Sequence, residues 1–161
     1  LGDMLPRESV IVAPDLGAAK LADRYATMLR LPVAFVHKER IGAADVKVHG
    51  VTGEVRGRTP VIVDDMVSTA GTIVAAAGAC IEAGANGSVV VAATHVLLVG
   101  TANERLQGLP LRSLFGTDSV AMPAITPACI ERVSLAELLA SEIADLHGCR
   151  GATENHRTHT V

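Results

Sequence analysis

The sequence has almost no aromatic residues and no tryptophan: 2% of its 161 residues are aromatic, although 49% are hydrophobic. The core must therefore be built from Val, Ala, Leu and Ile, which is typical of a buried parallel sheet packed by helices. The length suits one domain with a sizeable core. No apolar run reaches the roughly 20 residues of a membrane span, so we expect no membrane partner.

Charge and cysteine are also scarce. The formal net charge is −3 and no block of basic residues occurs, so we expect no nucleic-acid partner. The three cysteines, Cys80, Cys129 and Cys149, lack the spacing of metal ligands, and we expect Cys80 to be a small buried hydrophobe. We see no signal peptide and expect a cytoplasmic protein. Because the chain begins with Leu1 rather than Met, we expect it to be part of a longer protein or a shortened form of one.

The sequence does contain a regular alternation of apolar strands and helices. Strands are predicted at residues 9–13, 32–36, 60–63, 88–93, 111–115 and 130–134, and helices at residues 18–29, 72–83, 101–106 and 135–146. This order predicts an α/β fold, in which βαβ units with right-handed crossovers form a mostly parallel twisted sheet flanked by helices.

Two further segments complete the expected organisation. Residues 46–49 and 54–56 alternate around a glycine-containing turn, which predicts a small β-hairpin flap. Residues 149–161 are polar and show no periodicity, so we expect a disordered tail after a domain formed by residues 1–148. No internal repeat or linker divides that domain.

Polar residues follow four of the predicted strands at the point where each strand ends. They are Asp15, the pair His37–Lys38, the pair Asp64–Asp65 and the pair Thr94–His95. Because ligands bind beyond the carboxyl ends of the strands in such sheets, we expect these clusters to converge on one site. A structural role and a functional role are about equally compatible with His95.

The most informative stretch is residues 61–72, VIVDDMVSTAGT. An apolar strand ends at Asp64 and Asp65, whose carboxylates can accept hydrogen bonds from vicinal hydroxyls. A helix cap would need only one of them, and adjacent like charges are costly. The turn that follows can offer backbone N–H groups and hydroxyls to a phosphate, near the positive end of the next helix. The residues predicted to contact this phosphate are Ser68, Thr69, Ala70, Gly71 and Thr72.

Two other motifs allow a functional and a plain structural interpretation. Residues 14–20 are either an ordinary turn with Asp15 as a helix cap, or a diphosphate cradle with Asp15 on a metal ion. Lys38 and Arg40 are either part of a solvated face, or two cations on a loop that closes over a phosphoryl group. Neither a GxxxxGK[ST] loop nor a GxGxxG loop is present, so the pattern is not typical of a nucleoside triphosphate loop.

These residues resemble a known family. Residues 61–72 resemble the phosphoribosyl-binding motif of type I phosphoribosyltransferases and of ribose-phosphate diphosphokinases (phosphoribosyl pyrophosphate synthetases). Further stretches resemble the diphosphokinases specifically, with the motifs in that family's order from about residue 9 to residue 148. They are residues 13–17 (diphosphate loop), 37–40 (start of the catalytic flexible loop), 50–57 (hairpin) and 93–100 (following strand and turn).

The resemblance implies a type I phosphoribosyltransferase fold and a role for each motif. Asp64 and Asp65 would hold the ribose hydroxyls of ribose 5-phosphate, and residues 68–72 its phosphate. Lys38 and Arg40 would be catalytic, because they would stabilise the diphosphoryl group as it passes from ATP to the sugar. The diphosphate loop would consist of Asp15, Leu16, Gly17 and Ala18, with Asp15 helping to hold Mg²⁺.

Three features depart from the family's pattern. The diphosphokinases consist of two similar halves and this chain matches the C-terminal one, so we expect a homo-oligomer or a complementary N-terminal half as partner. Ser68 stands where the family often has Asp, which removes a negative charge near the sugar. Ala18 replaces the second glycine of the diphosphate loop, which is costly only if its φ is positive.

Two alternative functions follow from the same residues. One is a free-standing type I phosphoribosyltransferase, although residues 1–8 are too short for the base-binding hood such enzymes need and the tail lacks residues to stack a base. The other is a regulatory or scaffold homologue without catalysis, which would associate with an intact diphosphokinase. Ser68 and the single matching half favour this second alternative modestly.

Overall fold

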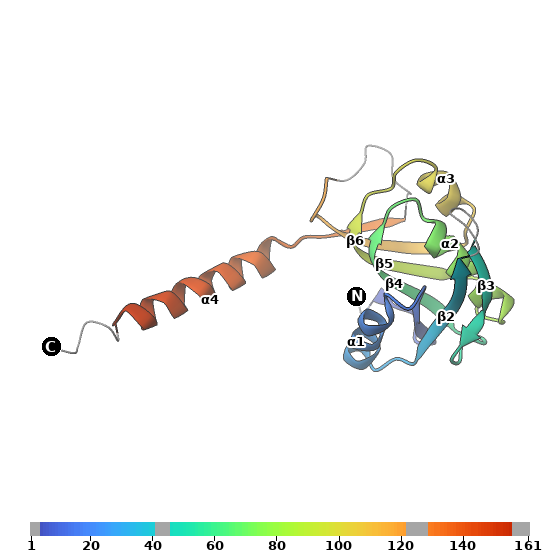
Figure 1. Cartoon of the computed structure of the whole chain (residues 1–161), viewed down its shortest axis with the longest axis horizontal. Helices are drawn as coiled ribbons and strands as arrows, with labels where there is room; N and C mark the ends of the chain where they lie inside the picture. The colour runs from blue at the N-terminus through green and yellow to red at the C-terminus, as the bar shows by residue number, and fades with distance from the viewer. Residues whose placement is uncertain (1–3, 41–45, 122–128, 156–161) are drawn as a thin grey trace.

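The structure, a computed structural model, describes residues 4–40, 46–121 and 129–155, with the backbone alone described for residues 38–40, 46–49 and 149–155. In this part of the chain seven strands form one sheet in the order β3-β2-β1-β4-β5-β6-β7, parallel throughout except for β3 (Figure 1). The strands are β1 Ser9–Ala13, β2 Val33–Arg40, β3 Val46–Thr52, β4 Thr59–Val67, β5 Val89–Val96, β6 Leu111–Thr117 and β7 Ile130–Val133. The helices are α1 Ala19–Leu29, α2 Gly71–Glu82, α3 Ala102–Gln107 and α4 Ala136–Asn155. The predicted α/β fold, with a mostly parallel sheet flanked by helices, is confirmed.

The sheet carries one hydrophobic core on each face, because successive side chains of a strand point to opposite sides. In β1, Val10 and Val12 belong to the core covered by α2 and α3, whereas Ile11 and Ala13 belong to the core covered by α1. The β4 side chains alternate in the same way, with Ile62 on the α2 face. Both faces of the central strands are therefore buried, and their continuous apolar runs follow from that burial.

Two central strands are longer than the apolar pattern predicted. β4 extends beyond Val63 to Val67, and β5 extends beyond Ala93 to Val96. The two remain paired over this extension, with Asp64 opposite Ala93. The acidic pair therefore lies within the paired part of β4, because its backbone pairing with β5 continues beyond the apolar residues of the strand.

A β-hairpin is present, but the prediction for its second strand is wrong. β3 pairs antiparallel with the outer part of β2, and residues 54–56 form no strand. The chain instead turns at Gly53, whose φ is +116°, and the next apolar side chain, Val55, is buried in the core with 4% of its surface exposed. The alternation of residues 54–56 thus reflects one residue pointing inward from a loop.

The α4 helix projects away from the body of the molecule (Figure 1). Its start is held by Asp118, which accepts hydrogen bonds from the backbone N–H of Leu135 at 2.8 Å and from the hydroxyl of Ser134 at 2.7 Å. These bonds lower the pKa of Asp118. The helix continues to Asn155, beyond the predicted end at residue 146, so the backbone of residues 149–155 is helical. The division of the chain at residue 148 stays a prediction, and residues 156–161 lie outside the described part.

Among the described helices, none combines the length and the apolar character needed to cross a membrane.

Candidate functional site

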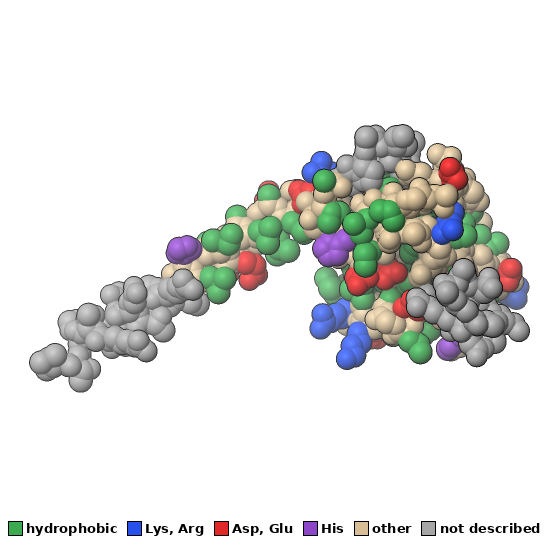
Figure 2. All heavy atoms as spheres, turned by 45° about the horizontal axis from the view of Figure 1, so that its top comes forward, with side chains coloured by type: hydrophobic (Ala, Val, Ile, Leu, Met, Phe, Trp, Pro, Cys, Tyr) green, Lys and Arg blue, Asp and Glu red, His purple; other side chains and the backbone are tan. Residues whose placement is uncertain are grey.

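A cleft of about 540 Å³ opens at the carboxyl end of β1 and β4, the two neighbouring strands at the centre of the sheet. Figure 2 shows a small group of acidic side chains near the centre of the body. Most of the sequence-predicted binding residues line this one cleft. They are Asp15, Gly17, Ala18, Asp64, Asp65, Ser68, Thr69, Ala70, Gly71 and Thr72. The cleft thus brings together the turn after β1, the end of β4 and the loop before α2.

The two adjacent carboxylates have different surroundings. Asp64 is half-buried, whereas Asp65 is exposed. Burial raises the pKa of Asp64 from its ordinary 3.8 to about 6, and the negative charges of Asp15 and Asp65 act in the same direction. A hydrogen bond from the backbone N–H of Asp65 to Asp64 Oδ1, 2.9 Å long, opposes this shift. The pair can therefore accept hydrogen bonds from a diol, and Asp64 takes up a proton at a higher pH than an ordinary aspartate does.

The loop before α2 has the geometry of an anion-binding turn. Ala70 adopts the left-handed conformation with φ +60° and ψ +5°, and as the N-cap residue of α2 it makes no side-chain cap hydrogen bond. The N-terminal N–H groups of a helix have no partner within the helix, so an anion can take them up. The loop is tied to the next βα connection, because the N–H of Val99 donates to the carbonyl of Ser68 at 3.0 Å.

The turn after β1 forms the opposite side of the cleft. Asp15 Oδ1 accepts a hydrogen bond from the backbone N–H of Ala18 at 3.2 Å, so Asp15 acts as a local cap for this turn. Ala18 has φ −83°, and alanine is therefore unstrained where the resembling family has glycine. Leu16, predicted as part of the diphosphate loop, does not line the cleft and is 80% exposed.

Among the remaining predicted residues His95, Lys38 and Arg40, only His95 has a described side chain. His95, at the end of β5, does not line it, and its Nδ1 lies 2.8 Å from the hydroxyl of Ser119. Lys38 and Arg40 belong to β2, but their side chains lie outside the described part of the structure. Their predicted catalytic role is therefore untested by the geometry.

The carboxylates of the cleft could supply only some of the ligands of a divalent cation. Within the described residues, no group of three or more His, Cys, Asp or Glu side chains is placed to hold a metal ion. Asp15 and Asp64 nevertheless both line the cleft, and the negative charge of Asp15 contributes to the raised pKa of Asp64. This donor set fits Mg²⁺, which is commonly bound by one or two carboxylates together with waters and substrate phosphates.

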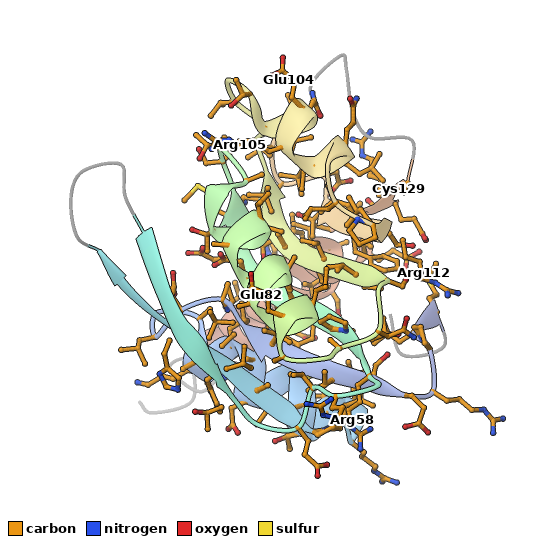
Figure 3. All side chains as sticks on the ribbon, turned by 90° about the vertical axis from the view of Figure 1, so that its right-hand side faces the viewer. Arg58, Glu82, Glu104, Arg105, Arg112 and Cys129 are labelled. Carbon is orange, nitrogen blue, oxygen red and sulfur yellow. The ribbon has the colours of Figure 1, made fainter. Side chains whose placement is uncertain are left out.

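Sequence reasoning missed one residue beside the site. Arg105, in α3, donates a hydrogen bond from Nη1 to the backbone carbonyl of Thr69 at 3.1 Å (Figure 3). The two residues are 36 positions apart in the sequence, and nothing in the short pattern of α3 marks this arginine. Its proximity to the loop is a product of tertiary packing alone.

Comparison with known proteins places this geometry in a family. The phosphoribosyl transferase domain model matches residues 6–107, more than half of the chain. The ribose-phosphate pyrophosphokinase of Staphylococcus haemolyticus is 37% identical over 139 residues, which cover 86% of this chain and 43% of that protein. The enzyme of the same name from Streptomyces avermitilis is 44% identical over 115 residues, which cover 70% and 35%. The chain therefore spans less than half the length of these relatives, and it matches their C-terminal part.

Solved structures agree with this relationship. The crystal structure of phosphoribosylpyrophosphate synthetase from Mycobacterium smegmatis matches with a TM-score of 0.76 and 33% identity, covering 88% of this chain and 45% of that one. The adenine phosphoribosyltransferase of Giardia lamblia matches with a TM-score of 0.52 at 16% identity, over 68% of each chain, and shares the fold alone. From its sequence match, its sheet and its cleft, this chain belongs to the phosphoribosyl transferase domain family.

Proposed function

We propose that this chain is the ribose 5-phosphate-binding domain of a ribose-phosphate diphosphokinase, the enzyme that transfers a diphosphoryl group from ATP to ribose 5-phosphate. One observation carries the proposal: the acidic pair on β4 and the N-terminal residues of α2 line the same cleft. A sugar phosphate is a ligand that presents hydroxyls at one end and an anion at the other. The cleft offers hydrogen-bond acceptors for the hydroxyls at one end and hydrogen-bond donors for the anion at the other.

Each end of the ligand has a set of residues in this proposal. The carboxylates of Asp64 and Asp65 accept hydrogen bonds from the ribose hydroxyls. The backbone N–H groups of residues 68–72 bind the phosphate, since α2 adds the positive end of its dipole at that point. The turn that begins at Asp15 lies across the cleft, where the diphosphoryl group would be held.

The reaction requires no covalent intermediate with the protein. The anomeric oxygen of the sugar attacks the β-phosphorus of ATP in line. A bond between that oxygen and the β-phosphorus forms. The bond from the β-phosphorus to the oxygen that bridges it to the α-phosphorus breaks, and AMP leaves with that oxygen as the hydroxyl proton passes to solvent. Lys38 and Arg40 would stabilise the charge on the moving group. Mg²⁺, held by Asp15 and the phosphates, would neutralise part of that charge when bound.

The whole reaction requires more than this chain in our proposal. The relatives contain a further, N-terminal part that this chain does not match, and that part would supply much of the ATP site. We therefore propose a complementary N-terminal half, or a homo-oligomer of a longer form, as the partner. A cytoplasmic enzyme of this kind would use ATP as the diphosphoryl donor.

Calorimetric titration of the chain with ribose 5-phosphate, in the presence of Mg²⁺, tests the sugar-phosphate site. We expect saturable one-to-one binding, and at least about tenfold weaker binding for Asp64→Asn, because the amide offers one acceptor fewer and no charge. Asp145→Asn is the matched control, since this carboxylate is exposed on α4 and should leave the affinity unchanged. Unchanged binding in Asp64→Asn would contradict the assignment of the acidic pair.

A second experiment separates the three candidate activities. If the N-terminal half of a relative, added in trans, restores formation of phosphoribosyl pyrophosphate from ATP and ribose 5-phosphate, the diphosphokinase proposal holds. Release of diphosphate from phosphoribosyl pyrophosphate with a nucleobase would instead support a free-standing phosphoribosyltransferase. Co-elution with an intact diphosphokinase, without turnover by this chain under any condition, would support a regulatory homologue.

A further inference from the structure

We propose that Arg105 is a positioning residue of the anion-binding loop: from α3 it holds the Thr69–Ala70 peptide in the orientation that phosphate binding requires. The identity of the ligand rests on the proposed function, whereas the bracing of the loop rests on the geometry of the free chain. Arg105 itself does not line the cleft. It contacts the loop of residues 68–72 through the backbone of Thr69.

The contact that carries the proposal is a charge-assisted hydrogen bond across two helices. Nη1 of Arg105 donates to the carbonyl oxygen of Thr69 at 3.1 Å, and bonds with an ionised donor are stronger than neutral ones. Figure 3 shows Arg105 extending from α3 toward the beginning of α2. The guanidinium therefore binds the loop at the peptide that leads into α2.

This bond fixes the direction of an N–H group. In a trans peptide the carbonyl and the following N–H are antiparallel because the unit is planar. While Arg105 holds the carbonyl of Thr69, the N–H of Ala70 must point away from α3. Ala70 and Gly71 both line the cleft, so the brace keeps this peptide from turning its carbonyl oxygen toward a bound anion.

The loop has a conformation that needs such support. Ala70 is held at φ +60°, a region that non-glycine residues rarely adopt because Cβ comes too close to the following carbonyl oxygen. As the N-cap residue of α2, Ala70 makes no side-chain hydrogen bond that would fix the first turn. Arg105 is one tertiary contact from outside the loop that opposes relaxation of Ala70 to negative φ.

The anchor of this brace is itself firmly placed. On α3, Ala102 and Leu106 are buried with 0% and 1% of their surface exposed, which fixes the helix against the core. Close approach of the guanidinium also depends on Gly71, because a Cβ at this position would lie 3.3 Å from Arg105 Nη1. Arg105 is thus positioned by α3, and the absence of a side chain at Gly71 leaves room for its guanidinium beside the loop.

The brace also adds charge to the site. The residues that line the cleft in the described part of the chain include no lysine or arginine. Arg105 brings a cation to the outer rim of the phosphate loop, which raises the local potential for an anion without contacting it. Its removal is therefore expected to weaken phosphate binding through both geometry and charge.

The test compares Arg105→Ala, Arg105→Lys and the control Arg112→Ala, with titrations of inorganic phosphate and of ribose 5-phosphate followed by amide NMR. Arg112 is exposed on β6, away from the cleft. We expect Arg105→Ala to weaken both ligands by the same factor, about tenfold. Arg105→Lys should recover part of this loss, and Arg112→Ala should bind as the wild type does. Asp64→Asn should weaken ribose 5-phosphate only, which separates the phosphate end from the sugar end.

The free protein gives a second readout that needs no ligand. Hydrogen exchange at the amides of Val74 and Val99, which donate to the carbonyls of Ala70 and Ser68, should be faster in Arg105→Ala, while exchange at Ala76 in the buried part of α2 stays the same. If the wild type takes up phosphate but not ribose 5-phosphate, the proposed function fails and the phosphate titrations still decide the role of Arg105. If the wild type binds neither phosphate nor ribose 5-phosphate, amide hydrogen exchange in the free protein decides the role of Arg105. Equal phosphate affinity, or equal exchange at Val74 and Val99, in Arg105→Ala and wild type would overturn the proposal.

Discussion

The backbone N–H of Asp65 donates a hydrogen bond of 2.9 Å to the side chain of Asp64, so one residue of the acidic pair binds the other through its main chain. The bond does not balance the desolvation of Asp64, whose pKa still rises from 3.8 to about 6. The folded protein consequently holds a proton on Asp64 more tightly than the unfolded chain does.

The free energy of unfolding should therefore contain a pH-dependent contribution from Asp64. With the pKa raised in the folded state, this contribution is fully present below pH 3.8, is lost as the pH rises to about 6, and is absent above that. Denaturant unfolding from pH 4 to pH 8 should show the difference between wild type and Asp64→Asn changing across this window. A difference that is constant with pH would contradict the raised pKa, and Asp145→Asn serves as the control for a surface carboxylate.

Two glycines should respond in opposite ways to replacement by alanine. Gly53 has φ +116°, and a Cβ there would lie 2.7 Å from the carbonyl oxygen of Val33. Gly53→Ala should therefore lower the free energy of unfolding by about 1–3 kcal/mol or more. Gly78 lies inside α2 with no atom within 4 Å of a Cβ, so Gly78→Ala should raise it by about 0.5–1 kcal/mol. Thermal and urea unfolding measure both changes, and a destabilised Gly78→Ala would show that α2 packs more tightly than described.

The cysteines should differ in reactivity toward thiol reagents. Burial raises the pKa of the Cys80 thiol to about 11, and the side chain has 0% of its surface exposed. Cys129 is partly exposed. Because the thiolate is the reactive form, iodoacetamide at pH 8 should modify Cys129 well before Cys80 in the native protein. Peptide mass spectrometry against a time course gives the two rates, and comparable rates in urea provide the control. Equal rates in the native protein would rule out the burial of Cys80.

The apolar side chains of α4 should contribute little to the stability of the isolated chain. Leu138, Leu139, Ile143 and Leu146 are 55–65% exposed. Replacing Leu139 and Ile143 by Ser should change the unfolding free energy by no more than about 0.5 kcal/mol, as at other exposed positions. The same change at Ile62, in the core with 0% exposed, should cost several kcal/mol. A large loss in the α4 variant would mean that this helix packs against something in solution.

The sequence predicted the central strands well because their residues are buried on both faces. β1 has the predicted bounds, residues 9–13, and the acidic pair and loop after β4 meet the turn after β1 as expected. The sequence predicts ends for β4 and β5 that are too early. The backbone pairing continues past polar side chains such as Asp64, which interrupt the apolar pattern. His95, for which the sequence is equally compatible with a structural and a functional role, does not line the cleft and lies beside Ser119.

Other features leave no trace in a short pattern. Arg105 reaches Thr69 across 36 residues, so no local periodicity points to it. Val55 has the alternation of a strand but reaches the core from a loop, because Gly53 turns the chain. Such features are set by tertiary packing, which local propensity does not encode.

The cleft spans β1 and β4, which pair in parallel with Val10 opposite Pro60. Its two sides are therefore distant in the sequence and close together only when the whole central sheet is assembled. A ligand that touches both sides is bound by the native state alone, so its binding free energy is added to global unfolding according to RT ln(1 + [L]/Kd). The melting temperature of this chain should consequently rise with the concentration of the ligand the cleft accepts, which makes heat resistance a screen for the identity of that ligand.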